Sequence, residues 1–281
     1  MRLLATGVVA LAIGTAWPAS AQLPLASAKA SGQTVTPAYE GWYRNADGTF
    51  SLAFGYLNRN AEEVVDVPIG PNNFITPGTE NQGQPSEFQP RRHWGVFAVK
   101  VPADFGTSKE VVWTLKFRGQ TYAIPGTLHP NWQIDALEGE AGSGNTPPVL
   151  RLGDKGPEAR GPGGATAGPL TATVGQPLPI TVWASDDGRS PAAALGGAAG
   201  RGAAAASVAL AWFKHQGPGK VTFTPVTGRA AAAGAQASTS AVFSAPGDYI
   251  VRIRANDSSG VTGAGHAQCC WTNGFVKVTV K

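Results

Sequence analysis

The chain is most informative at Leu210-Ala211-Trp212-Phe213-Lys214, at the Gly217-Pro218-Gly219 that follows, and at Val221-Thr222-Phe223. A longer run comes next, Phe243-Ser244-Ala245-Pro246-Gly247-Asp248-Tyr249-Ile250-Val251-Arg252-Ile253. Side chains in these runs alternate with a period of two, and glycine or proline separates one run from the next. This pattern is typical of antiparallel strands that bury one face each. It predicts a β-sandwich in this part of the chain.

Further strands of the same kind surround this region. Their core-facing residues recur at every second position and are Ile180, Val182 and Ala184, then Val208, Leu210 and Trp212, then Tyr249, Val251, Ile253 and Ala255, and finally Val276, Val278 and Val280. In an immunoglobulin-like sandwich, a tryptophan in the third strand fills the core between the two sheets. We expect Trp212 to have that place.

Residues 147–281 resemble bacterial PKD-type and related immunoglobulin-like extracellular repeats. The resemblance rests on Leu-x-Trp-x-Lys, Gly-Pro-Gly, Val-Thr-Phe and then Phe-Ser-Ala-Pro-Gly-Asp-Tyr-x-Val-Arg-Ile-x-Ala-x-Asp. It implies a spacer or binding module more than any chemistry. This copy departs from the pattern through two Ala/Gly tracts, residues 192–206 and 230–237, and a long loop before its last strand. We expect both tracts to be surface loops.

A second β-rich region precedes this one, over residues 35–138. Leu52, Phe54 and Tyr56 share one face of a strand, and a hairpin follows in which Val111, Trp113 and Leu115 alternate with polar residues before the turn at Gly119-Gln120. Residues 139–169 are rich in glycine and proline and read as a linker with a possible first strand at Val149-Leu150-Arg151-Leu152. The prediction is therefore an all-β chain of two immunoglobulin-like antiparallel β-sandwich domains, residues 35–138 and 170–281, joined by a Gly/Pro-rich linker.

The first 21 residues are typical of a secretory signal peptide. Arg2 supplies a positive charge, residues 3–16 are an apolar run interrupted only by small residues, and Ala19-Ser20-Ala21 offers small residues for cleavage before Gln22. The rest of the sequence has no second apolar run long enough to cross a bilayer. We expect the mature chain to be periplasmic or extracellular, without a membrane span.

The charge pattern argues against nucleic acid as a partner. The formal net charge is only +4 and the basic residues are scattered through the sequence instead of forming a stripe. The expected partner is a protein or a polysaccharide at the cell envelope.

The two cysteines, Cys269 and Cys270, are adjacent. Their α-carbons are about 3.8 Å apart, below the usual disulfide range, so they cannot join two sheets. In an oxidising compartment a vicinal disulfide, a bridge to another chain, or metal-bound thiolates stay open. We favour the vicinal disulfide because no other cysteine exists inside the chain.

Two sets of side chains are candidate metal ligands. His266 with Cys269 and Cys270 would suit copper or zinc, although a tight buried turn capped by Trp271 explains the same residues. Asp186 and Asp187 follow one strand, and Asn256 and Asp257 follow another whose end lies at the same end of an immunoglobulin topology. Their oxygens would suit calcium, although Asp and Asn also cap turns without an ion.

Four aromatic residues, Trp42, Tyr43, Trp94 and Trp132, lie in turn-like surroundings of the first domain. Exposed rings there would stack on sugars, whereas buried ones would only fill the core.

Catalytic motifs are absent from the sequence. It lacks a Gly-x-Ser-x-Gly elbow, a His-Glu-x-x-His pair and a phosphate-binding glycine loop that opens a helix. The prediction is a secreted, non-enzymatic binding or structural module of the bacterial envelope, acting in adhesion, scaffolding or carbohydrate contact. The alternative is a periplasmic metal-binding protein that uses His266, Cys269 and Cys270.

Overall fold

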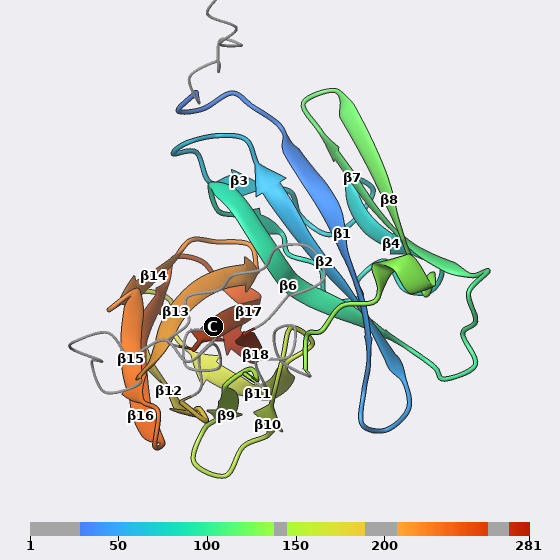
Figure 1. Ribbon diagram of the computed structural model, residues 1–281. Coiled ribbons are helices and arrows are strands. Elements are labelled where there is room, and N and C mark those ends of the chain that lie inside the picture. Colours follow the sequence, from blue (N-terminus) through green and yellow to red (C-terminus); the bar gives the residue numbers. More distant parts are fainter. Residues whose placement is uncertain (1–28, 138–144, 189–206, 258–269) are drawn as a thin grey trace, which may run out of the picture.

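The structure, a computed structural model, describes residues 29–137, 145–188, 207–257 and 270–281. Regular structure in these ranges is all β-sheet except for one short 3-10 turn, η1 (Pro130–Trp132). Figure 1 shows two bodies, one coloured blue to green and one coloured yellow-green to red. The prediction of two immunoglobulin-like β-sandwich domains is confirmed.

The first domain contains two three-stranded sheets with the orders β1-β2-β6 and β4-β7-β8, and a separate β3-β5 pair. The strands are β1 (Val35–Arg44), β2 (Phe50–Asn58), β3 (Val65–Asp66), β4 (Asn73–Thr76), β5 (Glu87–Phe88), β6 (Arg91–Val101), β7 (Glu110–Phe117) and β8 (Gln120–Thr127). Leu52, Phe54 and Tyr56 of β2 are buried, as their alternation predicts. The buried indole of Trp113 packs edge-on against Phe54 and donates a 2.9 Å hydrogen bond to Asn73 Oδ1.

The second domain contains two five-stranded sheets, with the orders β10-β9-β12-β16-β14 and β11-β18-β17-β13-β15. The strands are β9 (Val149–Leu152), β10 (Glu158–Ala159), β11 (Ala165–Ala172), β12 (Pro177–Ser185), β13 (Ser207–Gln216), β14 (Val221–Thr224), β15 (Thr227–Ala231), β16 (Ala235–Phe243), β17 (Gly247–Asn256) and β18 (Trp271–Val280). All pairings within these two sheets are antiparallel except β11 with β18, which is parallel. The possible strand in the linker is β9.

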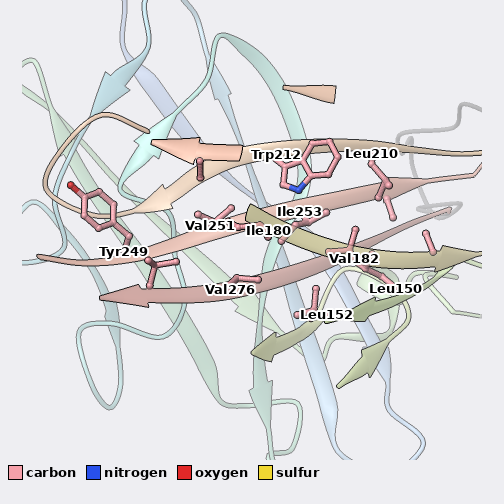
Figure 2. Close-up of a cluster of buried hydrophobic side chains, with 14 of the residues drawn as sticks. Leu150, Leu152, Ile180, Val182, Leu210, Trp212, Tyr249, Val251, Ile253 and Val276 are labelled. Atoms are coloured by element: carbon pink, nitrogen blue, oxygen red, sulfur yellow. The ribbon is translucent and has the colours of Figure 1, made fainter. Parts of the chain in front are cut away.

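The core of the second domain lies between these two sheets (Figure 2). Every residue predicted to face it, from Ile180 to Val280, is at most 4% exposed. Trp212 is 1% exposed and lies among these side chains. Tyr249, near the start of β17, donates a 2.8 Å hydrogen bond to Ala245 O and accepts one from Gly219 N. A tyrosine that bonds back to the preceding backbone is typical of immunoglobulin-like sandwiches.

One of the two expected loops is a pair of strands instead. Residues 230–237 form the end of β15, a turn, and the start of β16. Ala230 is buried in the core, where a small side chain fits between the sheets. Alanine has a weak preference for strands, but pairing with β13 and β12 overrides it. The other tract, residues 192–206, lies outside the described residues.

Candidate functional site

The predicted copper or zinc ligands lie mostly outside the described residues, because only Cys270 of the three belongs to them. Cys270 is fully buried and disulfide-bonded. The chain has one other cysteine, Cys269. A disulfide sulfur is not a thiolate, so Cys270 in this state does not offer the ligand that the copper or zinc hypothesis requires. The predicted signal peptide, residues 1–21, also lies outside the described part.

The predicted calcium ligands separate into two places. Asp186 and Asp257 are close enough that their charges interact, and Asp187 adds to this repulsion. Burial is the main reason that the pKa of Asp186 is raised, and the charges of Asp257 and Asp187 raise it further. Asn256 instead lines a groove on the outer face of the second domain. Over residues 29–137, 145–188, 207–257 and 270–281, no three His, Cys, Asp or Glu side chains are grouped as metal ligands would be.

Hydrogen bonds connect the carboxylates of Asp187 and Asp257 to the linker. Asp257 Oδ2 accepts a 2.6 Å bond from Asn145 Nδ2, and Asp187 Oδ2 accepts a 3.0 Å bond from Thr146 Oγ1. The carboxylates therefore hold the start of the second domain whether or not an ion binds.

The four aromatic candidates divide between surface and interior. Tyr43 is 4% exposed, and its hydroxyl accepts a 2.8 Å bond from Gly163 N of the second domain. Trp94 is half-buried with the guanidinium of Arg92 over its ring. Trp42 is half-buried and Trp132 is 49% exposed, the most exposed of the four.

Tyr39, Trp42 and Trp132 form what we call the aromatic surface. The rings of Tyr39 and Trp132 lie 5.4 Å apart, and Trp42 Nε1 donates a 2.9 Å bond to His129 O next to η1. Tyr39 in turn packs on Phe54 of the core. These contacts hold the rings in place at the surface, where they offer apolar faces to a ligand.

A junction between the two domains is the most elaborate feature of the molecule, and the sequence did not point to it. Three consecutive residues of β13 reach the first domain there. Lys214 Nζ lies 2.8 Å from Asp66 Oδ1 and 2.9 Å from Glu87 Oε2. His215 Nε2 lies 2.7 Å from Gly83 O.

The next residue, Gln216, donates a 2.6 Å bond to Gln84 O and exchanges amide hydrogen bonds with Asn81. Neighbouring side chains of a regular strand point to opposite faces, so three in a row could not all reach one partner. The register of β13 with β17 shifts between Lys214 and Gln216. Such a bulge turns side chains out of the regular alternation.

The outer face of the sheet β11-β18-β17-β13-β15 supplies the rest of the junction. We define the docking face by Phe213, Arg252, Trp271, Asn273 and Phe275. Asn273 Nδ2 donates to Gly95 O at 2.7 Å and Pro162 O at 2.8 Å, and Trp271 Nε1 donates to Gly95 O at 3.3 Å. Phe275 packs against the core of the first domain.

Gly95 lies directly under Trp271. Its φ is +45°, which a side chain would adopt only with strain, and a Cβ there would collide with the indole ring. In Figure 1, β6, which carries Gly95, is the strand of the first domain next to β17 and β18. The absence of a side chain at Gly95 therefore allows the close approach of the two domains.

Burial at the junction changes the pKa of several groups. Burial, with help from the Arg252 charge, lowers the pKa of His215 and of His93 from 6.5 to about 3, so both rings are neutral at pH 7. Burial lowers the pKa of Arg252 to about 10, so it stays charged. Its guanidinium lies 4.6 Å from the ring centre of Phe213. Burial alone would lower the pKa of Lys214. The hydrogen bonds and charges of Asp66 and Glu87 outweigh the effect of burial, so the pKa of Lys214 is raised.

None of the helical structure in the described ranges has the length and apolar character to cross a membrane. Comparison with protein-family models and with curated proteins finds no match.

Solved structures show similarity at low identity. Fibronectin(III)-like modules of Clostridium thermocellum CbhA are 12% identical, cover 88% of this chain and 94% of that chain, and have a TM-score of 0.24. The D00-D0 domain of intimin is 12% identical, covers 88% and 100%, and has a TM-score of 0.27. Domains 4 and 5 of the S-layer protein SbsC are 10% identical, cover 88% and 98%, and have a TM-score of 0.21. At these identities and TM-scores, the likenesses give no argument about function.

Proposed function

We propose that the protein is a secreted, non-enzymatic binding or structural module of the bacterial envelope whose two domains form one rigid unit. The buried junction carries this proposal. Domains joined by a linker generally move relative to each other unless their interface prevents it. Here Lys214, His215, Asn273 and Arg252 are each at most 4% exposed, and all of them lie between the domains.

The polar character of the junction makes it specific. If the domains separated, the amide of Asn273 and the ammonium of Lys214 would lose their hydrogen-bond partners. Each group would be left unpaired unless water replaced those partners. Reorienting the domains would break the same bonds, because each one depends on a particular backbone carbonyl or carboxylate. A scaffold that holds two surfaces at a fixed spacing needs this property, and a flexible spacer does not.

Thermal unfolding of the mature chain, residues 22–281, tests the rigid unit. Scanning calorimetry should give one cooperative transition. Lys214→Ala leaves Glu87 buried without its cation, and we expect it to lower the free energy of unfolding by about 3 kcal/mol or to split the transition in two. The matched control is Lys100→Ala, because Lys100 forms a 2.7 Å ion pair with Asp47 at the surface. Two transitions in the unmodified chain would contradict the proposal.

The aromatic surface supports carbohydrate contact as the more specific role. Its rings are fixed by packing, so a sugar would pay little ordering entropy on binding. Affinity electrophoresis of the mature chain in gels containing purified envelope polysaccharide tests this role. Trp132→Ala should restore free mobility, whereas Val226→Ala, at a 56% exposed apolar residue of the second domain, should not. Equal retardation of the unmodified chain and both variants would rule out carbohydrate binding through the aromatic surface.

The metal-binding alternative is less well supported. It needs thiolates at both cysteines, and Cys270 is disulfide-bonded. Elemental analysis of protein exported with its signal intact would restore this alternative only if it found stoichiometric copper or zinc that Cys269→Ser abolishes.

A further inference from the structure

A basic groove lies on the outer face of the second domain, next to the docking face. Its floor is β13, which presents the small side chains of Ala209 and Ala211 outward. In the strand register, Asn256, Ala209 and Arg229 form one row across β17, β13 and β15. Arg254, Ala211 and Thr227 form the next row. Two alanines between larger neighbours leave a hollow of about 470 Å³.

We call this hollow the arginine groove and define it by Ala209, Ala211, Thr227, Arg229, Arg254 and Asn256. Thr227 and Arg229 are exposed on β15, which ends this sheet. Arg254 and Asn256 form the opposite wall and are largely buried. The groove is therefore open on the β15 side and closed toward the junction.

Among the described residues, no carboxylate balances the charge of the groove, and the guanidinium of Arg254 lies 5.7 Å from the ring centre of Phe213. Among the described residues, no carboxylate forms an ion pair with Arg229 or Arg254, and none lines the groove. Arg252 adds a third positive charge two residues before Arg254 on β17. The stretches 189–206 and 258–269, which precede β13 and follow β17 in the sequence, contain no Asp or Glu. These two stretches therefore add no carboxylate to the groove, and Asp257, which follows Asn256, accepts a hydrogen bond from Asn145 in the described structure.

Two hydrogen-bond donors at the groove lack acceptors. Arg254 Nε and Asn256 Nδ2 are buried, and no acceptor in the described part of the chain bonds to either atom. Asn256 is only 8% exposed. Buried donors nearly always have partners, because an unpaired one has lost its hydrogen bonds to water without gaining another. An amide and a guanidinium without acceptors in one hollow indicate an acceptor that lies outside the described residues.

We propose that the arginine groove binds a carboxylate-bearing sugar, such as a uronate residue of an acidic polysaccharide. A guanidinium pairs with a carboxylate through two parallel hydrogen bonds, and Arg254 and Arg229 present one guanidinium from each wall. The hydroxyl of Thr227 and the amide of Asn256 match sugar hydroxyls. The hollow has the size of a small-ligand site. This inference extends the proposed binding role but does not depend on the aromatic surface or on rigidity.

Isothermal titration of the mature chain with sodium glucuronate and with an oligogalacturonate tests the groove. We expect saturable binding that weakens with added salt, and at least tenfold weaker binding to glucose, which lacks the carboxylate. Arg229→Gln should weaken uronate binding at least fivefold, and because Arg229 is an exposed edge residue this variant should still fold. Arg254→Gln should weaken it more. The matched control, Arg151→Gln on the other sheet, should leave the affinity unchanged.

Each other outcome overturns the assignment. Equal affinity for glucose would remove the role of the carboxylate. Binding of sodium sulfate as tight as that of glucuronate would indicate an inorganic-anion site instead of a sugar site. Undiminished uronate binding in Arg229→Gln and Arg254→Gln, with native unfolding curves, would place the ligand elsewhere. A negative result here leaves the calorimetric test of the rigid unit and the gel test of the aromatic surface unaffected.

Discussion

Asn273 of β18 donates a 2.7 Å hydrogen bond to the carbonyl of Gly95 in β6, across 178 residues of sequence. The same amide nitrogen lies 2.8 Å from Pro162 O, so one fully buried side chain joins the first domain, the connection between β10 and β11, and the last strand. Few single side chains determine the relative placement of three segments in this way. Its removal should therefore affect the whole molecule.

We expect Asn273→Ala to lower the free energy of unfolding by about 1–3 kcal/mol, because two buried carbonyls lose their donor. Urea unfolding followed by tryptophan fluorescence measures the loss. Asn131→Ala, at an exposed position of η1, is the control and should change little. A similar value for both variants would show that the amide contributes nothing to the junction.

Acid should destabilise the junction through its histidines. In the unfolded chain a histidine gains its proton near pH 6.5, whereas His93 and His215 gain theirs only near pH 3 in the folded chain. Their contribution to stability is thus complete above pH 6.5 and is lost as the pH falls toward 3. The slope should be about 1.4 kcal/mol per pH unit for each histidine.

Unfolding curves at pH 7, 6 and 5 check this slope, and His215→Gln should reduce it by about half. Burial raises the pKa of Glu87 at the same junction, so Glu87 contributes in the opposite direction. The lowered pKa values of Asp47 and Glu63 act only at lower pH. A stability that stays constant from pH 7 to pH 5 would show that neither ring is buried in its neutral form.

Tyr249→Phe should weaken the second domain. The change removes the acceptor of Gly219 N and the donor to Ala245 O while it keeps the ring that fills the core. We expect a loss of about 1–2 kcal/mol in the free energy of unfolding. Tyr122→Phe removes a hydroxyl that makes one contact, 3.1 Å to Thr34, and should cost less. The reverse order of the two effects would contradict the role given to Tyr249.

The interaction of Asp186 with its neighbouring carboxylates allows a test of calcium binding. The pKa of Asp186 is raised in the folded chain, so its contribution to stability falls as the pH rises through its titration. Without an ion, Asp186→Asn should therefore stabilise the fold at pH 7 and have no such effect at pH 3. If calcium binds as predicted, it should raise the melting temperature of the unmodified chain, and Asp186→Asn should abolish that increase. A destabilised variant in calcium-free buffer at pH 7 would contradict the repulsion between the carboxylates.

The disulfide at Cys270 can be assigned chemically. A vicinal bridge to Cys269 predicts a monomer on non-reducing gels, no alkylation by iodoacetamide in urea, and two alkylated thiols per chain after reduction. A dimer that dissociates on reduction would assign the bridge to a second chain instead.

The sequence predicted the core well because burial imposes a period of two on a strand. Every core position assigned to the second domain, Trp212 included, is buried. The junction escaped prediction because its residues look like the solvent-facing half of the same alternation. Arg252 and Asn273 occupy such positions, and their partners lie far away in sequence. A cue existed in Lys214-His215-Gln216, where three polar residues in a row interrupt the alternation.

Tyr43 shows the same limit in the first domain. Its turn-like surroundings suggested a sugar-stacking ring, whereas the hydroxyl bonds to Gly163 and the ring is buried. Local sequence cannot show that another domain covers a residue. Trp132, by contrast, is 49% exposed among the described residues and stays a candidate for sugar contact.

The strand β18 lies between β11 and β17, in the interior of its sheet, and it also carries Trp271 and Asn273. The chain is synthesised from its N-terminal end, so these ten residues are made after every other strand described above. Until they are made, β17 and β11 have no common neighbour, and β6 lacks its contacts with Trp271 and Asn273. A chain cut short before residue 271 would thus leave apolar side chains and unpaired strand edges exposed in both domains, and we expect proteases to degrade such products quickly.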